Sequence, residues 1–203
     1  MVHTALEFFR RNFFVIDFGI AVAAPLSAWL LYRMGRIGRF EWALFWLGFA
    51  LGLTWEIPMQ ALNAAGPEWA VHGYVRLPPA PNWVIAIMHS FWDGGLFLIG
   101  VGVVRLLRGP AAFTRLSGVE LAALIVWGQA SELWVELTAT FGEAWFYLVK
   151  PWNPALFKFN GQDITLMPQL IWLAAPVVFY FGALWLRRKI RDYERKEYSP
   201  QRR

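Results

Sequence analysis

The segment from Trp83 to Leu106, WVIAIMHSFWDGGLFLIGVGVVRL, is long and apolar enough to cross a membrane, yet it carries His89 and Asp93 one helical turn apart. An ionisable pair at this depth costs several kcal/mol unless it is paired or faces a polar cavity. We therefore expect these two side chains to belong to a functional site. The alternative is a pair that only holds neighbouring helices together.

The composition of the 203-residue chain is that of an integral membrane protein, since 58% of its residues are hydrophobic and 18% are aromatic. The chain has no cysteine, which excludes disulfides, thiolate nucleophiles and iron–sulfur clusters. Only one of its three histidines, His89, lies in a hydrophobic segment, so a haem or di-iron centre is not expected. We expect neither a metal nor a cofactor.

The hydrophobic pattern predicts an all-α fold, a five-helix membrane bundle in one domain over residues 1–189, with a basic C-terminal tail over 187–203. A long loop separates the second and third spans, and another separates the fourth and fifth. The spans are expected at about 13–34, 40–57, 83–106, 117–140 and 164–186.

Local signals define several of the expected ends. Pro58 should end the second span, because proline cannot donate the helical hydrogen bond. Ser117 should open the fourth span in a capping box with Glu120. Residues 141–163 are aromatic and polar, which predicts an interfacial loop or a short surface helix.

The basic residues predict the orientation in the membrane. Basic turns follow spans one and three, and the net charge of +5 is concentrated in the tail after span five, so all three lie on one side. That side should be cytoplasmic, with the N-terminus and the long loops outside. Arg10 and Arg11 oppose this assignment. The tail is typical of a lipid-surface anchor and not of a nucleic-acid-binding segment.

Several spans place polar groups at similar depths in the outer half of the bilayer. Counting about 1.5 Å per helical residue from the outer ends places His89 about 9 Å deep and Glu132 about 12 Å deep. Within span four, Gln129, Glu132 and Glu136 share one face. The members of this polar layer are Glu56, His89, Asp93, Glu132, Gln169 and Trp172.

Such a layer can support proton transfer. A carboxylic acid in an apolar pocket keeps its proton near neutral pH and can deliver it to an alkene or epoxide, and a second group can remove a proton elsewhere. Tryptophans can stabilise a carbocation between the two steps, although each one alone is also a common packing residue or interface anchor. The tryptophans near the layer include Trp55, Trp92, Trp127, Trp134 and Trp172.

The order and spacing of several short motifs resemble the emopamil-binding protein family, the EXPERA-type five-span membrane proteins that include sterol Δ8-Δ7 isomerase. The motifs are Glu56, Trp92-Asp-Gly-Gly-Leu96, Gly128-Gln129 and Gln169-Leu-Ile-Trp172-Leu-Ala-Ala-Pro176. The similarity covers roughly Phe40 to Arg188.

This resemblance implies a homodimeric enzyme whose cavity receives a sterol-like molecule, with acidic residues moving protons and a tryptophan facing the cationic intermediate. Glu56 matches the family's second-span glutamate, Gln169 its fifth-span asparagine and Trp172 its tryptophan. Two positions depart from the family, because Gly52 replaces a histidine and Ile85 replaces a glutamate. His89 and Asp93 are expected to supply those groups from neighbouring positions.

We therefore expect an intramembrane isomerase that shifts a double bond in a steroid, a sterol or a similar polycyclic lipid. The catalytic candidates are Glu56, His89, Asp93 and Glu132. The substrate-binding candidates are Trp55, Trp92, Gln129, Trp134, Glu136, Gln169 and Trp172.

Three alternatives stay open. Trp55-Glu56 followed by a Trp-Asp pair resembles the integral-membrane meroterpenoid cyclases, which protonate an epoxide. A second alternative is a binding protein for sterols or cationic amphiphiles, like the sigma-two receptor. The third is a small transporter that uses the same acids as a proton relay.

Overall fold

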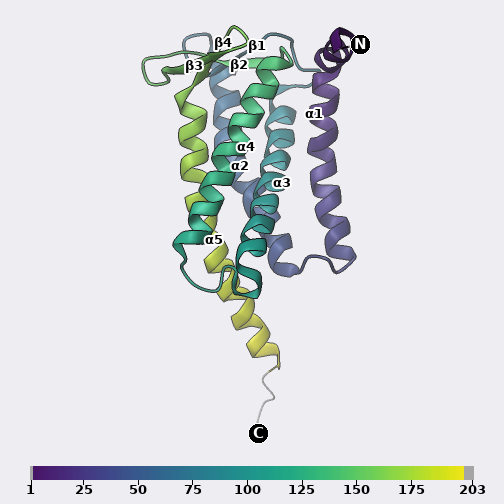
Figure 1. Cartoon of the computed structure of the whole chain (residues 1–203), viewed down its shortest axis with the longest axis vertical. Coiled ribbons are helices and arrows are strands. Elements are labelled where there is room, and N and C mark those ends of the chain that lie inside the picture. The colour runs from purple at the N-terminus through teal and green to yellow at the C-terminus, as the bar shows by residue number, and fades with distance from the viewer. Residues whose placement is uncertain (1, 199–203) are drawn as a thin grey trace.

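The computed structural model describes residues 2–198, in which five long helices form a bundle and four short strands cap one end (Figure 1). The helices are α1 (Val2–Arg33), α2 (Arg39–Ala65), α3 (Asn82–Arg108), α4 (Gly118–Phe141) and α5 (Leu166–Tyr198), and a 3₁₀ turn, η1 (Gly109–Ala111), follows α3. The strands are β1 (His72–Tyr74), β2 (Trp145–Tyr147), β3 (Ala155–Phe159) and β4 (Gln162–Thr165). The all-α prediction is thus correct for the bundle but misses the strands.

The strands lie in the two long loops. β1 pairs antiparallel with β2, and β3 pairs antiparallel with β4. The prediction of a loop or a short surface helix for residues 141–163 therefore misses the strands that this connection contains. Asn160 and Gly161 both have positive φ, 49° and 81°, and they form the two-residue turn between β3 and β4. An Asn-Gly pair favours this tight hairpin turn because both residues tolerate positive φ.

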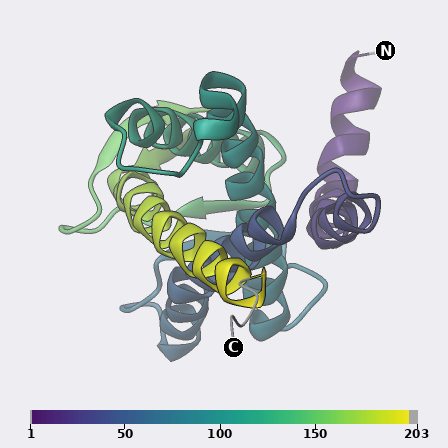
Figure 2. The same cartoon turned by 90° about the horizontal axis from the view of Figure 1, so that it is seen from below.

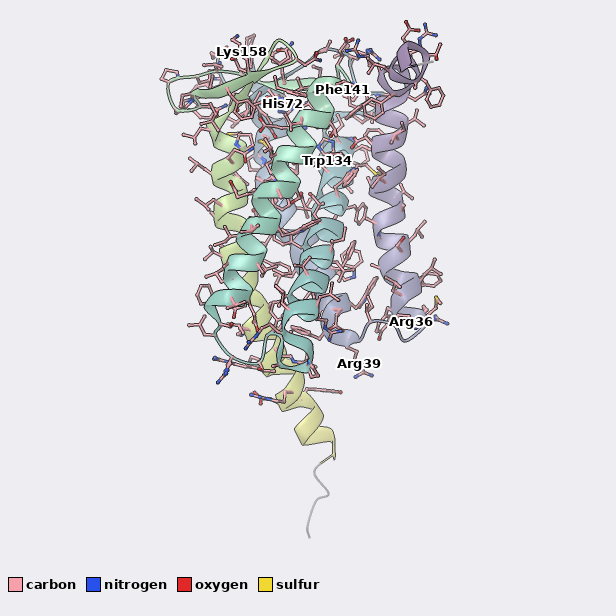
Figure 3. All side chains as sticks on the ribbon, viewed as in Figure 1. Arg36, Arg39, His72, Trp134, Phe141 and Lys158 are labelled. Atoms are coloured by element: carbon pink, nitrogen blue, oxygen red, sulfur yellow. The ribbon has the colours of Figure 1, made fainter. Side chains whose placement is uncertain are left out.

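All five helices run along the long axis of the molecule (Figure 1). The strands and the N-terminus lie at one end, called the strand end below, whereas the labelled Arg36 and Arg39 lie at the opposite end (Figure 3). Seen along the axis, α1 stands at the edge of the bundle (Figure 2). It packs mainly against α3, and this leaves one side of α1 facing outward.

Glycines allow α2 and α3 to approach closely. A Cβ on Gly94 would lie 3.0 Å from the carbonyl oxygen of Phe45, and one on Gly48 would lie 2.9 Å from Cβ of Phe97. Small residues at such crossings let helix backbones pack in an apolar medium. This contact fixes the two helices that carry Glu56 and His89.

The length and apolar composition of the helices indicate a membrane protein. Within the described residues, three helical segments are long and apolar enough to cross a membrane: Thr4–Arg33, Asn82–Ala111 and Leu166–Tyr193. The remaining two helices, α2 and α4, are 27 and 24 residues long and lie among them. Both carry buried glutamates, including Glu56 on α2 and Glu132 on α4.

One predicted helix end is wrong, and one predicted helix cap does not form. Pro58 lies inside α2, which continues to Ala65. The extra turns are held by tertiary contacts, because Gln60 is buried and Asn63 bonds to the backbone of the following loop. Ser117 occupies the N-cap of α4, but its side chain makes no capping hydrogen bond. The expected capping-box partner, Glu120, instead accepts hydrogen bonds from the Phe113 amide and the Tyr180 hydroxyl.

The C-terminal basic stretch continues the last helix. α5 extends past the predicted span end at residue 186 and includes Arg187, Arg188 and Lys189. Residues 199–203 of the predicted tail, with Arg202 and Arg203, lie outside the described residues.

Candidate functional site

A cavity of about 250 Å³ lies among the helices toward the strand end. One water occupies roughly 30 Å³ in the liquid, so the cavity has the size of a small ligand. Most of its wall is apolar, and polar side chains from α1, α2, α3, α4, β1 and β2 converge on it. These polar residues are Asp17, Glu56, Gln60, His72, Tyr74, His89, Asp93, Glu132, Thr138 and Tyr147.

The four catalytic candidates all line this cavity. Glu56 comes from α2, His89 and Asp93 from α3, and Glu132 from α4. Four of the binding candidates line it as well: Trp55, Trp92, Trp134 and Trp172.

An imidazole bridges two carboxyl groups in the wall of the cavity. Nε2 of His89 lies 3.3 Å from Oδ2 of Asp17, and Nδ1 lies 3.3 Å from Oε2 of Glu56. Because both ring nitrogens face a carboxyl oxygen, a doubly protonated ring donates to both partners at once. The bridge joins α1, α2 and α3 at one point.

Asp17 is a site residue that was not among the predicted ones. It is an acid four residues inside the predicted first span, so the depth count already places it at about 6 Å, in the same outer layer. Its backbone carbonyl also accepts a hydrogen bond of 3.0 Å from Nε1 of Trp92. Asp17 therefore attaches α1 to α3 through both its side chain and its main chain.

The carboxyl group of Asp93 occupies space that Gly52 leaves open on α2. A Cβ on Gly52 would lie 3.0 Å from both Cβ and Cγ of Asp93 and would collide with Oδ2. Among the described residues, this buried Oδ2 has no hydrogen-bond partner. The Asp93 carboxyl group can therefore take this position only because residue 52 has no side chain.

Glu132 is the second carboxyl group without a partner. It is buried, and in the described part of the chain it takes part in no hydrogen bond or ion pair. Tyr147 of β2 also lines the cavity. Burial, and after it the charge of Glu132, raises the pKa of Tyr147 well above its usual value, so its hydroxyl stays protonated.

Three of the predicted binding residues are absent from the cavity wall. Nε2 of Gln169 donates to Oε2 of Glu136 at 2.8 Å, and Nε2 of Gln129 donates to the Gln169 carbonyl at 2.9 Å. Oε1 of Glu136 accepts from the Thr165 amide at 3.4 Å. Gln129, Glu136 and Gln169 therefore connect α4 to α5 and β4 instead of lining the cavity.

Three uncharged, hydrogen-bonded side chains, Gln60, His72 and Tyr74, close the cavity at the strand end. The Tyr74 hydroxyl lies 3.0 Å from Nε2 of His72 and 3.3 Å from Nε2 of Gln60. Burial, and after it the charge of His89, lowers the pKa of His72 to about 3. Burial, partly offset by Gln60, raises the pKa of Tyr74 to about 12. Both groups are uncharged at neutral pH.

The cavity opens between α1 and α4. Ile16 and Ile20 on α1 line the cavity yet are exposed, and Trp134 on α4 lines it with 69% of its surface exposed. Figure 3 shows Trp134 on the side of α4 that faces α1. All three side chains are apolar and lie within the helical part of the bundle. A ligand leaving through this opening meets an apolar surface.

The described residues hold no group of three or more His, Cys, Asp or Glu side chains arranged to bind a metal ion. The chain matches no protein-family model, no curated protein and no solved structure. The proposal below therefore depends on the geometry of the cavity.

Proposed function

We propose that this protein is a five-span membrane isomerase that shifts a double bond in a polycyclic, steroid-like or sterol-like lipid by acid–base proton transfer. The observation that carries the proposal is the cavity itself. An apolar wall with four converging carboxyl groups and two imidazoles opens on the apolar flank of the bundle. A lipid can reach such a site from the bilayer without crossing water.

The five-span topology rests on helix length and on charge. At a rise of about 1.5 Å per residue, α2 and α4 measure roughly 40 and 36 Å, enough to cross a hydrocarbon core of about 30 Å. Arg36 and Arg39 lie at the end opposite the strands (Figure 3). The excess of basic residues at that end favours a cytoplasmic location for it and for the C-terminus.

The roles follow from which carboxyl groups have partners. Asp93 and Glu132, which have none, are assigned as acids that give a proton to one alkene carbon. The carbocation left on the adjacent carbon loses a proton from its other side to Glu56, which His89 orients. One proton enters and one leaves, so the lipid changes only in the position of its double bond. Trp55, Trp92 and Trp172 line the cavity, and we assign them to stabilise the cation.

The test is isomerisation of a steroid and sterol panel in heavy water, followed by mass spectrometry. We expect one deuterium at the carbon that gains a hydrogen. Glu56→Gln and Asp93→Asn should each lower the rate about 10²-fold or more, the scale of a positioned acid or base. Glu136→Gln is the matched control, because that buried glutamate lies outside the cavity wall. Variants at 56 and 93 that exchange as fast as the parent would remove those residues from the mechanism.

A binding protein is the second candidate, and the unpartnered carboxyl groups favour it. Asp93 and Glu132 can pair with the amine of a cationic amphiphile, while the tryptophans contact its apolar part. A binder would return the ligand chemically unchanged from the heavy-water assay. The cyclase and the homodimer suggested by resemblance stay predictions. The same assay would reveal a cyclase as ring closure of a linear polyene.

A further inference from the structure

A second pocket lies behind the strand-end wall of the cavity and shares His72 and Tyr74 with it. Its other lining residues come from the end of α2, the following loop and the start of α3: Asn63, Ala70, Leu77, Pro78, Ala80 and Asn82. Leu77 exposes 86% of its surface, so this pocket faces the surroundings of the protein. His72, labelled in Figure 3, lies at the strand end.

A hydrogen-bonded chain crosses the wall between the two pockets. Nδ2 of Asn63 donates to the His72 ring and lies 2.8 Å from its Nε2. Nε2 of His72 in turn lies 3.0 Å from the Tyr74 hydroxyl. That hydroxyl is within 3.4 Å of both polar atoms of the Gln60 amide. Gln60 follows Glu56 by one turn of α2, and both line the cavity.

We propose that His72 and Tyr74 form a proton-exchange route between the aqueous phase at the strand end and the carboxyl groups of the cavity. This inference rests on the proposed acid–base function, because a site that alternately gives and takes protons must be able to restore its protonation state. It assigns His72 and Tyr74 a role in that function, and it states that the protons are exchanged with the aqueous phase at the strand end.

The transfer balances without any redox partner. Glu56, protonated after turnover, gives its proton through cavity water to the Tyr74 oxygen, and the Tyr74 hydroxyl passes its original proton to Nε2 of His72. Nδ1 of His72 then releases its own proton to a water in the outer pocket. At the end Glu56 is a carboxylate again, His72 is the other neutral tautomer, Tyr74 is unchanged, and the hydronium outside is taken up by the bulk.

The charged neighbours of the wall keep both relay groups neutral. Tyr74 faces Glu56 of α2 and Asp17 of α1, whose negative charges disfavour a tyrosinate. His72 faces His89 of α3, whose positive charge disfavours a second cation, and its ring packs against Tyr147 of β2. A neutral relay does not trap a proton midway, since neither residue holds a net charge between transfers.

The experiment places the full chain in lipid vesicles and imposes a pH jump on one side. Time-resolved infrared spectroscopy follows the protonated-carboxyl band, which Glu56→Gln and Asp93→Asn assign. We expect a jump on the strand side to reach the carboxyl groups at least tenfold faster than a jump on the other side. Tyr74→Phe should slow the strand-side response at least tenfold.

Tyr147→Phe is the matched control, because Tyr147 lines the same cavity but belongs to no hydrogen bond of the chain described above. Its response should stay within twofold of the parent. His72→Gln, which keeps a polar side chain but has no second ring nitrogen, should slow the response as Tyr74→Phe does. Near-ultraviolet circular dichroism establishes that each variant is folded.

An unchanged rate in Tyr74→Phe, or equal slowing in Tyr74→Phe and Tyr147→Phe, would overturn the route. No lipid substrate is added, so this result is independent of turnover. Normal exchange through Tyr74 in a protein that isomerises no lipid would overturn the proposed function and leave the route intact.

Discussion

Replacing Gly52 by alanine tests the packing that admits the Asp93 carboxyl group to the cavity wall. The new methyl group would lie 3.0 Å from Cβ and Cγ of Asp93 and would collide with Oδ2. Overpacking of this kind costs about 1 to 3 kcal/mol. Alanine in place of glycine in a helix contributes about 1 kcal/mol in the opposite direction. The free energy of unfolding should therefore fall by up to about 2 kcal/mol.

A double-mutant cycle isolates the contact. In an Asp93→Ala background the methyl group at position 52 no longer meets a carboxyl group, so Gly52→Ala should stabilise by about 1 kcal/mol. The coupling energy between the two changes should then be about 1 to 3 kcal/mol. Gly102→Ala is the control on α3, because a Cβ at Gly102 meets nothing within 4 Å. It should stabilise equally in both backgrounds.

The assay is reversible unfolding in mixed detergent micelles, monitored by tryptophan fluorescence. Additivity of Gly52→Ala and Asp93→Ala within about 0.5 kcal/mol would show that the two positions do not share this space. It would also refute the idea that Asp93 supplies, from α3, a polar group in place of one at position 52.

Three further outcomes follow from the packing and the charges. Stability should fall as the pH drops below about 6.5, because folding lowers the pKa of His72 to about 3 and the unfolded chain binds the proton first. The loss of unfolding free energy caused by His72 approaches about 5 kcal/mol near pH 3. His72→Gln should remove this part of the pH dependence. Glu120→Ala should cost about 3 to 5 kcal/mol in thermal unfolding, because it leaves the buried end of Arg108 without its ion pair, whereas Tyr180→Phe should cost about 1 kcal/mol. Glu143→Gly should be nearly neutral in chemical unfolding and Glu143→Ala destabilising, because φ at Glu143 is 50° and glycine offsets the lost ion pairs with Arg10 and Arg76.

The convergence of Glu56, His89, Asp93 and Glu132 on one cavity could be predicted because a helix has a uniform rise. Counting residues inward from a shared surface compares depths on antiparallel helices without any knowledge of their packing. This brought Glu56, His89, Asp93 and Glu132 into one layer, and all four line one cavity. The same count applied to Asp17 would have included it, since its depth matches theirs.

The neighbour that each polar side chain of a helix faces could not be predicted. Gln129, Glu132 and Glu136 share one face of α4, but at 100° per residue they spread across about 60° of its circumference. The position of α5 divides that arc, so Glu132 faces the cavity while the other two bond toward α5 and β4. The sequence of α4 alone does not determine where α5 packs against it. In contrast, the β3–β4 hairpin has a local signal, because an Asn-Gly pair such as Asn160-Gly161 favours a two-residue turn.

The charge held by the cavity supports acid-initiated chemistry. Asp17, Glu56, Asp93 and Glu132 line a space of about 250 Å³ together with the imidazoles of His89 and His72, and His72 is uncharged at neutral pH. Full ionisation, even with His89 protonated, would leave three negative charges uncompensated in an apolar wall, and burying unpaired charge costs several kcal/mol for each ion. Among the described residues, no arginine or lysine lines the cavity to offset them. The cheaper arrangement keeps protons on the carboxyl groups that have no partner. An enzyme that begins by protonating an alkene needs such a store of protons in its resting state, beside a paired carboxylate that can take one back.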